Sequence, residues 1–354
     1  MTTRIGQQIN KALLDNKITK TEVDSLIAEA KANGKVSATE KKELTSFLKT
    51  AGDKFDADAK SALSAFLGVA VPPPPPTKPT APATPTTPTS PTTNTNPVPL
   101  ANDPAVLTKH SSSVSWTKVD GGELFKDGVS YDDVMQGQIG DCYFVGAISA
   151  VAYQDPKAIE NAIKDNGDGT YTARFFSKGV DGKMKPNYVR VDGDIPSSYG
   201  GRSTYAKSRD SKEMWVTLLE KAYASFKGGY EAIGNGGYPT EVMTAITGSS
   251  SSYYATKTNT ADQLFDLIQL GSEMKTPMTA LTYGEDKKDM YTGTGVYAWH
   301  NYSVLGATVE NGEKFVQLRN PWGSSEPGND GKNDGIFKMK LADFAKLYMG
   351  LNVN

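Results

Sequence analysis

A run of prolines and threonines divides this 354-residue chain into two parts. It lies between about Val69 and Pro99 and reads VAVPPPPPTKPTAPATPTTPTSPTTNTNPVP. Proline lacks the backbone N–H that helices and central strands need, and threonine and alanine offer little apolar surface to bury. We therefore predict a flexible, extended linker over residues 69–100, rising roughly 3 Å per residue. A glycosylated stalk and a docking ligand for another protein are the alternatives for such a tract.

The residues before the linker contain a repeated helix-start signal. KITKTEVDSL recurs eighteen residues later as KVSATEKKEL. Each copy places a hydroxyl residue three positions before a glutamate, which is the capping-box spacing. These pairs are Thr19 with Glu22 and Ser37 with Glu40. We predict a small all-α domain over residues 1–68, serving as a prosegment, a targeting device or a docking module.

One segment of this domain has the length of a calcium-binding EF-hand loop. It runs from residue 29 to residue 40, but Lys31 stands where an oxygen ligand is required. A degenerate pair of helices is therefore the favoured interpretation. Leu26 and Leu44 occupy equivalent places in the two helices, and a further helix is expected from Asp56 to Leu67.

Composition excludes several classes of function. The formal net charge is -2, so no overall basic field indicates a nucleic-acid partner. No apolar run approaches the roughly 20 residues that span a bilayer, and the first residues lack the apolar core of a secretory signal. A single cysteine excludes an internal disulfide. We expect a soluble protein, cytoplasmic by default, with leaderless secretion as the alternative.

After the linker the sequence changes to mixed helix and strand. In residues 101–235, CYFVGAISAVA predicts a buried helix that begins at Cys142, and KEMWVTLLEKAYASF predicts an amphipathic helix. DNGDGTYTARFF is interpreted as a hairpin turn leading into a strand rather than a metal loop. Residues 236–354 contain a short helix, four strand candidates (TPMTALTY, HNYSVLGATV, KFVQLR and GIFKM) and a last helix, LADFAKLY. This order predicts an α+β fold of a helical lobe and an antiparallel β lobe, with a cleft between them.

The lone cysteine is a candidate nucleophile. A thiol attacks a carbonyl as thiolate, which a helix N-terminus and a nearby imidazolium favour. Cys142 begins a predicted helix, and of the two histidines His110 lies in a polar segment near the linker. His300 heads an alternating strand, and Asn320 ends the next strand, so two antiparallel neighbours would place them side by side. Trp322 would then cover the bond between them.

Four motifs in order resemble the signatures of the calpain family of papain-like cysteine proteases. They are QGQIGDCYF, WVTLLEKAYASFKGGYEAI, HNYSV and LRNPWG, and the resemblance covers about residues 115–350. It implies a two-lobed papain-like protease core in which Cys142 is the nucleophile, His300 the general base and acid, and Asn320 the residue that orients His300. Gln136 would donate its side-chain amide to the oxyanion, with the Cys142 N–H as second donor.

The resemblance also implies substrate-binding residues. Gly236 and Gly237 match the glycines that let a substrate backbone hydrogen-bond along the cleft. Trp322 matches the tryptophan that shields the catalytic pair. Trp299 stands where calpains usually carry a glycine, so we expect a narrower cleft or an altered specificity.

Calpain protease cores bind two calcium ions, so the resemblance implies calcium as an activator. The residues that match the ligands of the first site are Gly128, through its carbonyl, Asp133 and Glu213. The residues that match the second site are Glu326 and either Asn333 or Asp334. Solvated loop charge is the alternative for all these acids. No counterpart of the β-sandwich or the multi-EF-hand domain of animal calpains is expected, so calcium control would lie in the core.

These features together predict a calpain-like cysteine endopeptidase that hydrolyses protein substrates through a thioacyl intermediate on Cys142. We expect calcium activation and self-processing between residues 70 and 110. A catalytically silent peptide-binding scaffold of the same fold, and a cysteine-dependent acyl transferase or ligase, are the alternatives. A partner of the N-terminal helical domain is left open.

Overall fold

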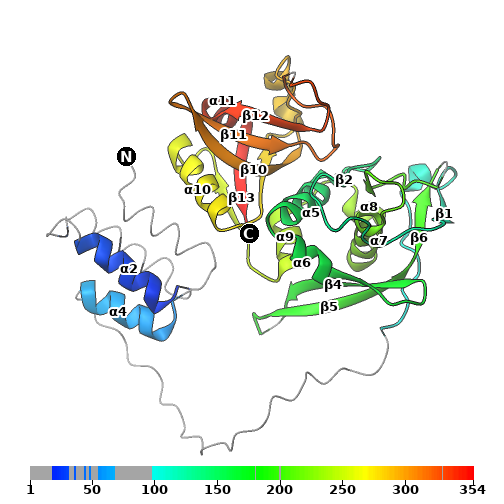
Figure 1. Cartoon of the computed structure of the whole chain (residues 1–354), viewed down its shortest axis with the longest axis horizontal. Helices are drawn as coiled ribbons and strands as arrows, with labels where there is room; N and C mark the ends of the chain where they lie inside the picture. Colours follow the sequence, from blue (N-terminus) through cyan, green and yellow to red (C-terminus); the bar gives the residue numbers. More distant parts are fainter. Residues whose placement is uncertain are drawn as a thin grey trace, which may run out of the picture. The chain divides into compact units, whose positions relative to one another are not determined.

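The structure is a computed structural model, and Figure 1 shows its elements along the chain. The residues it describes are 18–31, 36, 44, 48, 55–67, 98–179, 181–198, 201–328 and 330–354. Two compact units divide the chain, Met1–Val98 and Pro99–Asn354. The Ser37–Glu40 capping pair, most of the segment of EF-hand length and linker residues 69–97 lie outside the described residues.

The described part of the first unit contains two helices, α2 (Lys20–Lys31) and α4 (Ala57–Leu67). The Thr19 N–H donates to Glu22 Oε2 at 2.8 Å, which confirms the first predicted helix start. Asp56 Oδ1 accepts from the Ala59 N–H at 2.7 Å and caps the predicted later helix. Leu26 and Leu44, the equivalent positions of the sequence repeat, are both buried in the core of this unit.

The second unit has two lobes (Figure 1). The helices of the helical lobe are α5 (Cys142–Gln154), α6 (Pro156–Ala162), α7 (Trp215–Lys227), α8 (Tyr230–Ile233), α9 (Pro239–Thr247) and the 3-10 turn η1 (Thr108–His110). Its strands are β1 (Ser115–Lys118), β2 (Val134–Met135), β3 (Ile163–Asp165), β4 (Thr170–Lys178), β5 (Met184–Asp192), β6 (Asp194–Ser197) and β7 (Lys207–Ser208). The antiparallel sheet β3-β4-β5 contains the predicted hairpin turn.

Helix α7 differs from its prediction as an amphipathic helix. Its residues from Trp215 to Ala224 are all buried, Glu220 and Lys221 included. The Lys221 amine lies 2.6 Å from both Asp103 and Asp192 and 4.4 Å from the centre of the Trp116 ring. Because Asp103 and Trp116, from the first part of the second unit, and the end of β5 cover the charged side of α7, this helix lies in the interior of the lobe.

The β lobe is a six-stranded antiparallel sheet in the order β12-β11-β10-β9-β13-β8. Its strands are β8 (Ser252–Ala255), β9 (Met278–Thr282), β10 (Asn301–Glu310), β11 (Glu313–Arg319), β12 (Ile336–Lys340) and β13 (Tyr348–Val353). Its helices are α10 (Ala261–Glu273), α11 (Leu341–Leu347) and the 3-10 helix η2 (Glu285–Tyr291). All four strand candidates form strands, and α11 is the predicted last helix, so the α+β fold is confirmed.

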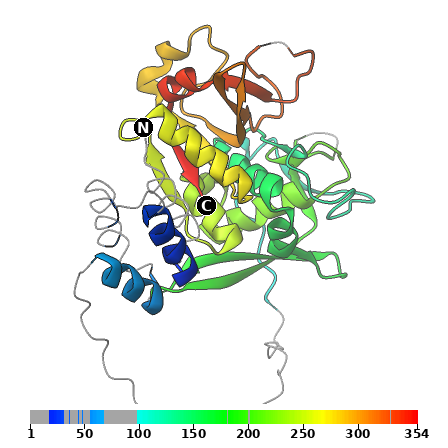
Figure 2. The same cartoon turned by 60° about the vertical axis from the view of Figure 1, so that its left-hand side comes forward.

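The sequence analysis missed β8, α10 and β13. Helix α10 packs along the sheet (Figure 2). Its start carries a complete capping box, in which Thr260 Oγ1 accepts from the Gln263 N–H and Gln263 Oε1 accepts from the Thr260 N–H. That spacing was therefore the available signal. The predicted lobe boundary at residue 236 stays a prediction, although α9, which follows it, contributes Val242 and Ile246 to the helical-lobe core.

Helix α5 joins the two lobes by packing against β10. Ser303 Oγ donates to the Gly146 carbonyl at 2.8 Å, and Asn301 Nδ2 donates to the Cys142 carbonyl at 3.4 Å. A Cβ on Gly146 would lie only 2.4 Å from Asn301 Nδ2, so the close approach needs glycine. The start of α5 is thereby fixed against the strand that follows His300. Within the described residues, none of the helices has the length and apolar character to cross a membrane.

Candidate active site

A tight loop between β2 and α5 carries the candidate nucleophile. A Cβ on Gly137 would lie 2.2 Å from the Tyr205 carbonyl oxygen, and one on Gly140 would lie 2.7 Å from that of Gly234. Both glycines of QGQIGDC are therefore required because other backbone segments approach closely. The loop delivers Cys142 to the first position of α5, as predicted.

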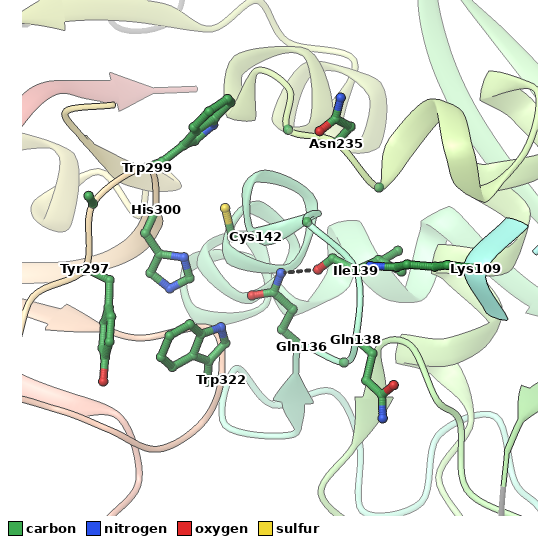
Figure 3. A pocket seen from close by; sticks show the side chains of 15 residues that line it. Lys109, Gln136, Gln138, Ile139, Cys142, Asn235, Tyr297, Trp299, His300 and Trp322 are labelled. Carbon is green, nitrogen blue, oxygen red and sulfur yellow. Dashed lines mark hydrogen bonds between the residues drawn. The ribbon is translucent and has the colours of Figure 1, made fainter. Parts of the chain in front are cut away.

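Cys142 lies at the base of a cleft of about 650 Å³ (Figure 3). The residues that line this cleft include Lys109, Gln136, Gly236, Trp299, His300 and Trp322. Cys142 is 8% exposed. Burial raises the pKa of its thiol to about 12, and the Asp141 charge contributes to this increase. In this arrangement the thiol keeps its proton at neutral pH.

His300 faces the same cleft from the turn before β10, and Asn320 follows β11. His300 Nε2 lies 3.0 Å from Asn320 Oδ1. The same oxygen accepts the Trp322 N–H at 3.2 Å, while Asn320 Nδ2 donates to the Ser325 carbonyl at 3.1 Å. These bonds fix the orientation of the amide, so Nε2 carries the imidazole proton and Nδ1 is free to accept one.

Aromatic rings enclose this histidine. The Trp322 ring centre lies 4.8 Å from that of His300, and Tyr302 meets the imidazole edge-on at 4.9 Å. The Tyr297 ring centre lies 4.4 Å from that of Trp322, with the two rings tilted at 57°. Burial among these rings lowers the pKa of His300 to about 4, so the imidazole is neutral at neutral pH.

The structure brings the thiol and the imidazole to one cleft from different lobes (Figure 3). In the part of the chain that is described, no hydrogen bond joins Cys142 Sγ to His300, and both groups are in their uncharged forms. Such an arrangement can become a thiolate–imidazolium pair when the two atoms approach, because each charge then stabilises the other.

Gln136 is engaged within the nucleophile loop. Its Nε2 donates to the Ile139 carbonyl at 2.8 Å and to Asp141 Oδ1 at 3.2 Å, while its Oε1 is buried without a hydrogen-bond partner. The role of oxyanion donor that the resemblance implies requires one of these amide hydrogens to be released to the substrate. The longer bond, to Asp141, is the weaker of the two.

The predicted substrate-binding glycines lie against the nucleophile loop. The Gly236 N–H donates to the Gly140 carbonyl at 2.8 Å, and Gly236 has a φ of +80°. A Cβ on Gly237 would lie 2.5 Å from the Tyr143 ring. Both positions therefore need glycine for backbone shape and packing, and of the two Gly236 lines the cleft while Gly237 does not.

Trp299 belongs to the β lobe, and its side chain extends over the cleft. Its φ is +48°, a left-handed conformation that costs a non-glycine residue roughly 1–2 kcal/mol, and its side chain is 63% exposed. Its indole Nε1 lies 3.4 Å from the place that a Cβ on Gly236 would occupy. The indole thus covers Gly236.

Asp133 and Glu213, the predicted calcium ligands, converge beside the nucleophile loop. Asp133 Oδ2 accepts from the Ser130 N–H at 2.8 Å, and Glu213 Oε1 accepts from the Lys126 N–H at 3.2 Å. Burial raises the pKa of Glu213 to about 7, and the Asp133 charge contributes to that shift. Burial also raises the pKa of Asp133.

Two adjacent carboxylates of this kind suit a hard divalent cation. No three Asp, Glu, His or Cys side chains gather for a metal among the described residues. A cation here would therefore need backbone and water oxygens too.

The residues predicted for a second calcium site cap the loop between β11 and β12. Glu326 Oε2 accepts from the Gly335 N–H at 2.9 Å. Asn333 Oδ1 accepts from the Ser325 N–H at 2.8 Å, and Asp334 Oδ1 accepts from the Ile336 N–H at 3.0 Å. Each of these side chains thus already stabilises the loop that follows Asn320.

Sequence reasoning missed several residues around the site. Arg319 is fully buried, and its guanidinium donates to the Val134 carbonyl at 2.7 Å, which ties β11 to the nucleophile lobe. Its place directly before Asn320 in LRNPWG was the only signal. Lys109 reaches the cleft because the neighbouring His110 stacks on Tyr205, with ring centres 5.7 Å apart. His110 itself does not line the cleft.

Comparisons with known proteins agree with this geometry. The model of the calpain family cysteine proteases matches residues 103–330, more than half of the chain. The calpain-type cysteine protease ADL1 of Oryza sativa subsp. japonica is 32% identical over 228 residues, which cover 61% of this chain and 10% of that protein. The thiol protease of Porphyromonas gingivalis is 31% identical over 258 residues, covering 60% and 52%. Calpain-A of Drosophila melanogaster is 29% identical over 223 residues, covering 58% and 26%.

The alignments therefore span between 10% and 52% of the length of these relatives. The family match covers the nucleophile loop, His300 and Asn320. On the family match, the chain belongs to the calpain family of cysteine proteases.

Proposed function

We propose that this chain is a cysteine endopeptidase that hydrolyses peptide bonds of protein substrates through a thioacyl intermediate on Cys142. One observation carries the proposal. Cys142 at the start of α5 and His300 line the same cleft, and the 3.0 Å bond from His300 Nε2 to Asn320 Oδ1 leaves Nδ1 able to accept a proton.

Each half of the reaction, acylation and deacylation, needs one proton transfer to His300 and one from it. His300 Nδ1 takes the thiol proton of Cys142, and the thiolate attacks the substrate carbonyl carbon. The Cys142 backbone N–H, at the start of a helix, and a released Gln136 amide hydrogen stabilise the oxyanion. The imidazolium then gives its proton to the leaving amine. Water, deprotonated by His300, then attacks the thioester carbonyl carbon, the C–S bond breaks to release the carboxylic acid, and the imidazolium returns its proton to the Cys142 thiolate.

Burial sets the resting state of this site. A thiol with a pKa of about 12 and an imidazole with a pKa of about 4 both stay uncharged, so the free enzyme is a weak nucleophile. Approach of the two side chains on substrate binding would lower the first pKa and raise the second, because each ion stabilises the other. We expect the reactive ion pair to form in this step.

Calcium is a proposed activator. Asp133, Glu213 and the Gly128 carbonyl would hold the ion, and Glu326 with Asn333 or Asp334 is a second candidate set. A bound cation would supply positive charge that neutralises the two carboxylates. Asp133 is connected to the site along the chain, because β2 (Val134–Met135) follows it directly and leads into Gln136.

The test is casein hydrolysis by the purified chain, with calcium and with excess chelator, beside Cys142→Ala. We expect cleavage by the parent and none by the variant. Labelling with an epoxide inhibitor should modify Cys142, and product mass spectrometry should show free carboxyl ends rather than acyl transfer to amines. Casein cleavage that survives in Cys142→Ala would overturn the proposed nucleophile. Activity that is equal in calcium and chelator would remove calcium from the proposal.

A further inference from the structure

Two buried acidic side chains lie behind the nucleophile and take no part in the steps above. Asp141 directly precedes Cys142, and Glu220 lies in the middle of α7; each has 0% of its surface exposed. Buried carboxylates are ordinarily paired with cations, because an isolated charge is costly in the interior. Within the described residues, neither forms an ion pair with a lysine or arginine.

Among the described residues, backbone and amide donors reach one oxygen of each carboxyl. Glu220 Oε1 accepts from the Ala206 N–H at 2.9 Å, and Asp141 Oδ1 accepts from Gln136 Nε2 at 3.2 Å. Asp141 Oδ2 and Glu220 Oε2 meet no such donor. The two carboxyls face each other, and the Tyr230 hydroxyl also lies against Glu220. Because a carboxylate cannot donate, a hydrogen bond between the two carboxyls requires that one of them is protonated.

The surroundings of the pair favour a single negative charge. The other titratable groups that face it are Tyr143, Tyr205, Tyr230, Lys207 and Cys142. Lys207 is the positively charged group among these five. Burial raises the pKa of Asp141 to about 7, and burial together with the Asp141 charge raises that of Glu220 well above its usual range. Burial therefore favours the pair holding one proton to a higher pH than an exposed carboxyl would.

The pair connects a rigid helix to the catalytic loop. Glu220 lies in the buried helix α7, and Asp141 is the residue directly before the nucleophile. Gln136, which donates to Asp141, lies at the start of the loop. The Gln136 N–H also donates to the Pro321 carbonyl at 2.8 Å, next to Asn320. Any movement of Asp141 would therefore change the position of Gln136 at the junction of the two lobes.

We propose that Asp141 and Glu220 share one proton and that this pair positions Gln136 and the first residue of α5. Both are positioning residues, since neither lines the cleft. The effect on catalysis rests on the proposed function, whereas the shared proton does not. An O–H···O⁻ bond between carboxyls is strong and short, and it suits a fixed distance between α7 and the loop.

Glu220→Gln and Glu220→Ala separate this role from simple filling of space. The glutamine amide replaces the shared proton with an N–H donor, so kcat should stay within about threefold of the parent. Alanine leaves Asp141 without its partner, and kcat should fall about tenfold to a hundredfold with KM little changed, because the loop is displaced. Glu273→Gln, an exposed position on α10, is the matched control and should match the parent. Equal impairment of the two Glu220 variants, or full activity of Glu220→Ala, would overturn the positioning role.

Infrared difference spectroscopy tests the proton without any activity. At about pH 9, above the ordinary range of carboxyl titration, the parent should show the C=O band of a protonated carboxylic acid. Glu220→Gln should lack that band, and Glu273→Gln should retain it. A parent without the band, or a band that persists in Glu220→Gln, would overturn the shared proton. A parent that shows the band but cleaves no protein would contradict the proposed function and leave the shared proton standing.

Discussion

His300 Nε2 lies 3.0 Å from Asn320 Oδ1, at the ends of the two neighbouring strands that the sequence predicted to bring them together. The strands β10 and β11 pair with Ser303 opposite Arg319, so the residue before one strand and the residue after the other meet at the same end of the sheet. Because the amide oxygen also accepts the Trp322 N–H, the imidazole is held in one tautomer.

Asn320→Ala should lower kcat by about a hundredfold, because His300 loses the acceptor that fixes its tautomer. Asn320→Asp keeps an oxygen at the same place and should recover part of that loss. Steady-state kinetics on a peptide substrate give both values. An alanine variant with unchanged kcat would show that the 3.0 Å bond has no catalytic role.

Trp299→Gly should raise kcat/KM for peptides with bulky side chains, because the indole no longer covers Gly236. It should also stabilise the fold by about 1 kcal/mol relative to Trp299→Ala, since glycine adopts a φ of +48° without strain. The alanine variant opens the cleft and keeps the strain, so the pair separates the two effects. Chemical denaturation measures stability. A Trp299→Gly enzyme with the parent's kcat/KM would contradict the covering role.

Burial of neutral His300 makes stability depend on pH. Its pKa is about 4 in the folded chain and near 6.5 when unfolded, so the unfolded state binds the proton first as pH falls. The contribution of His300 to the free energy of unfolding should therefore decrease by about 3 kcal/mol between about pH 6.5 and pH 4. The raised pKa values of Asp141 and Glu213 act in the opposite direction, so the His300 contribution is measured as a difference. Urea unfolding of the Cys142→Ala chain, compared with the same chain carrying His300→Gln, should show this loss. His110→Gln, at the other histidine, should keep it.

Lys109→Glu should change the preference among substrates. Lys109 is a charged side chain on the cleft wall, held there by the bond of the adjacent Thr108 N–H to Glu231 Oε1 at 2.7 Å. Acidic peptides should be cut about two- to fivefold faster than matched basic ones by the parent, and the order should reverse in the variant. High salt should weaken both effects. Lys118→Glu, exposed on β1, is the control, and the same preference in both variants would exclude Lys109 as its source.

We expect the cleavage sites of self-processing to lie before Ala101. From there the backbone is bound, because the Ala101 N–H donates to the Arg190 carbonyl at 2.8 Å and Asp103 lies 2.6 Å from the Lys221 amine. Proteases cut exposed, unbound chain. Intact mass of the purified parent should place the new N-terminus between residues 70 and 98, and Cys142→Ala should stay whole. Trimming of the pure variant would contradict a reaction within the chain.

The sequence by itself determined the elements that carry the site. The apolar run after Cys142 predicted α5, because a helix apolar on all sides must be buried. The alternation after His300 and before Asn320 predicted β10 and β11, since period-2 patterns identify strands from local residues alone. The motifs then assigned the family.

Only the tertiary structure decided what depends on contacts between distant segments. KEMWVTLLEKAYASF read as amphipathic because Glu220 and Lys221 are charged, yet the packed lobe buries both. Likewise, no pattern near Trp299 revealed that its indole would cover Gly236, or that Lys109 would reach the cleft. Local sequence sets backbone preference and apolar periodicity, whereas burial of a polar side chain is set by the partners that folding brings to it.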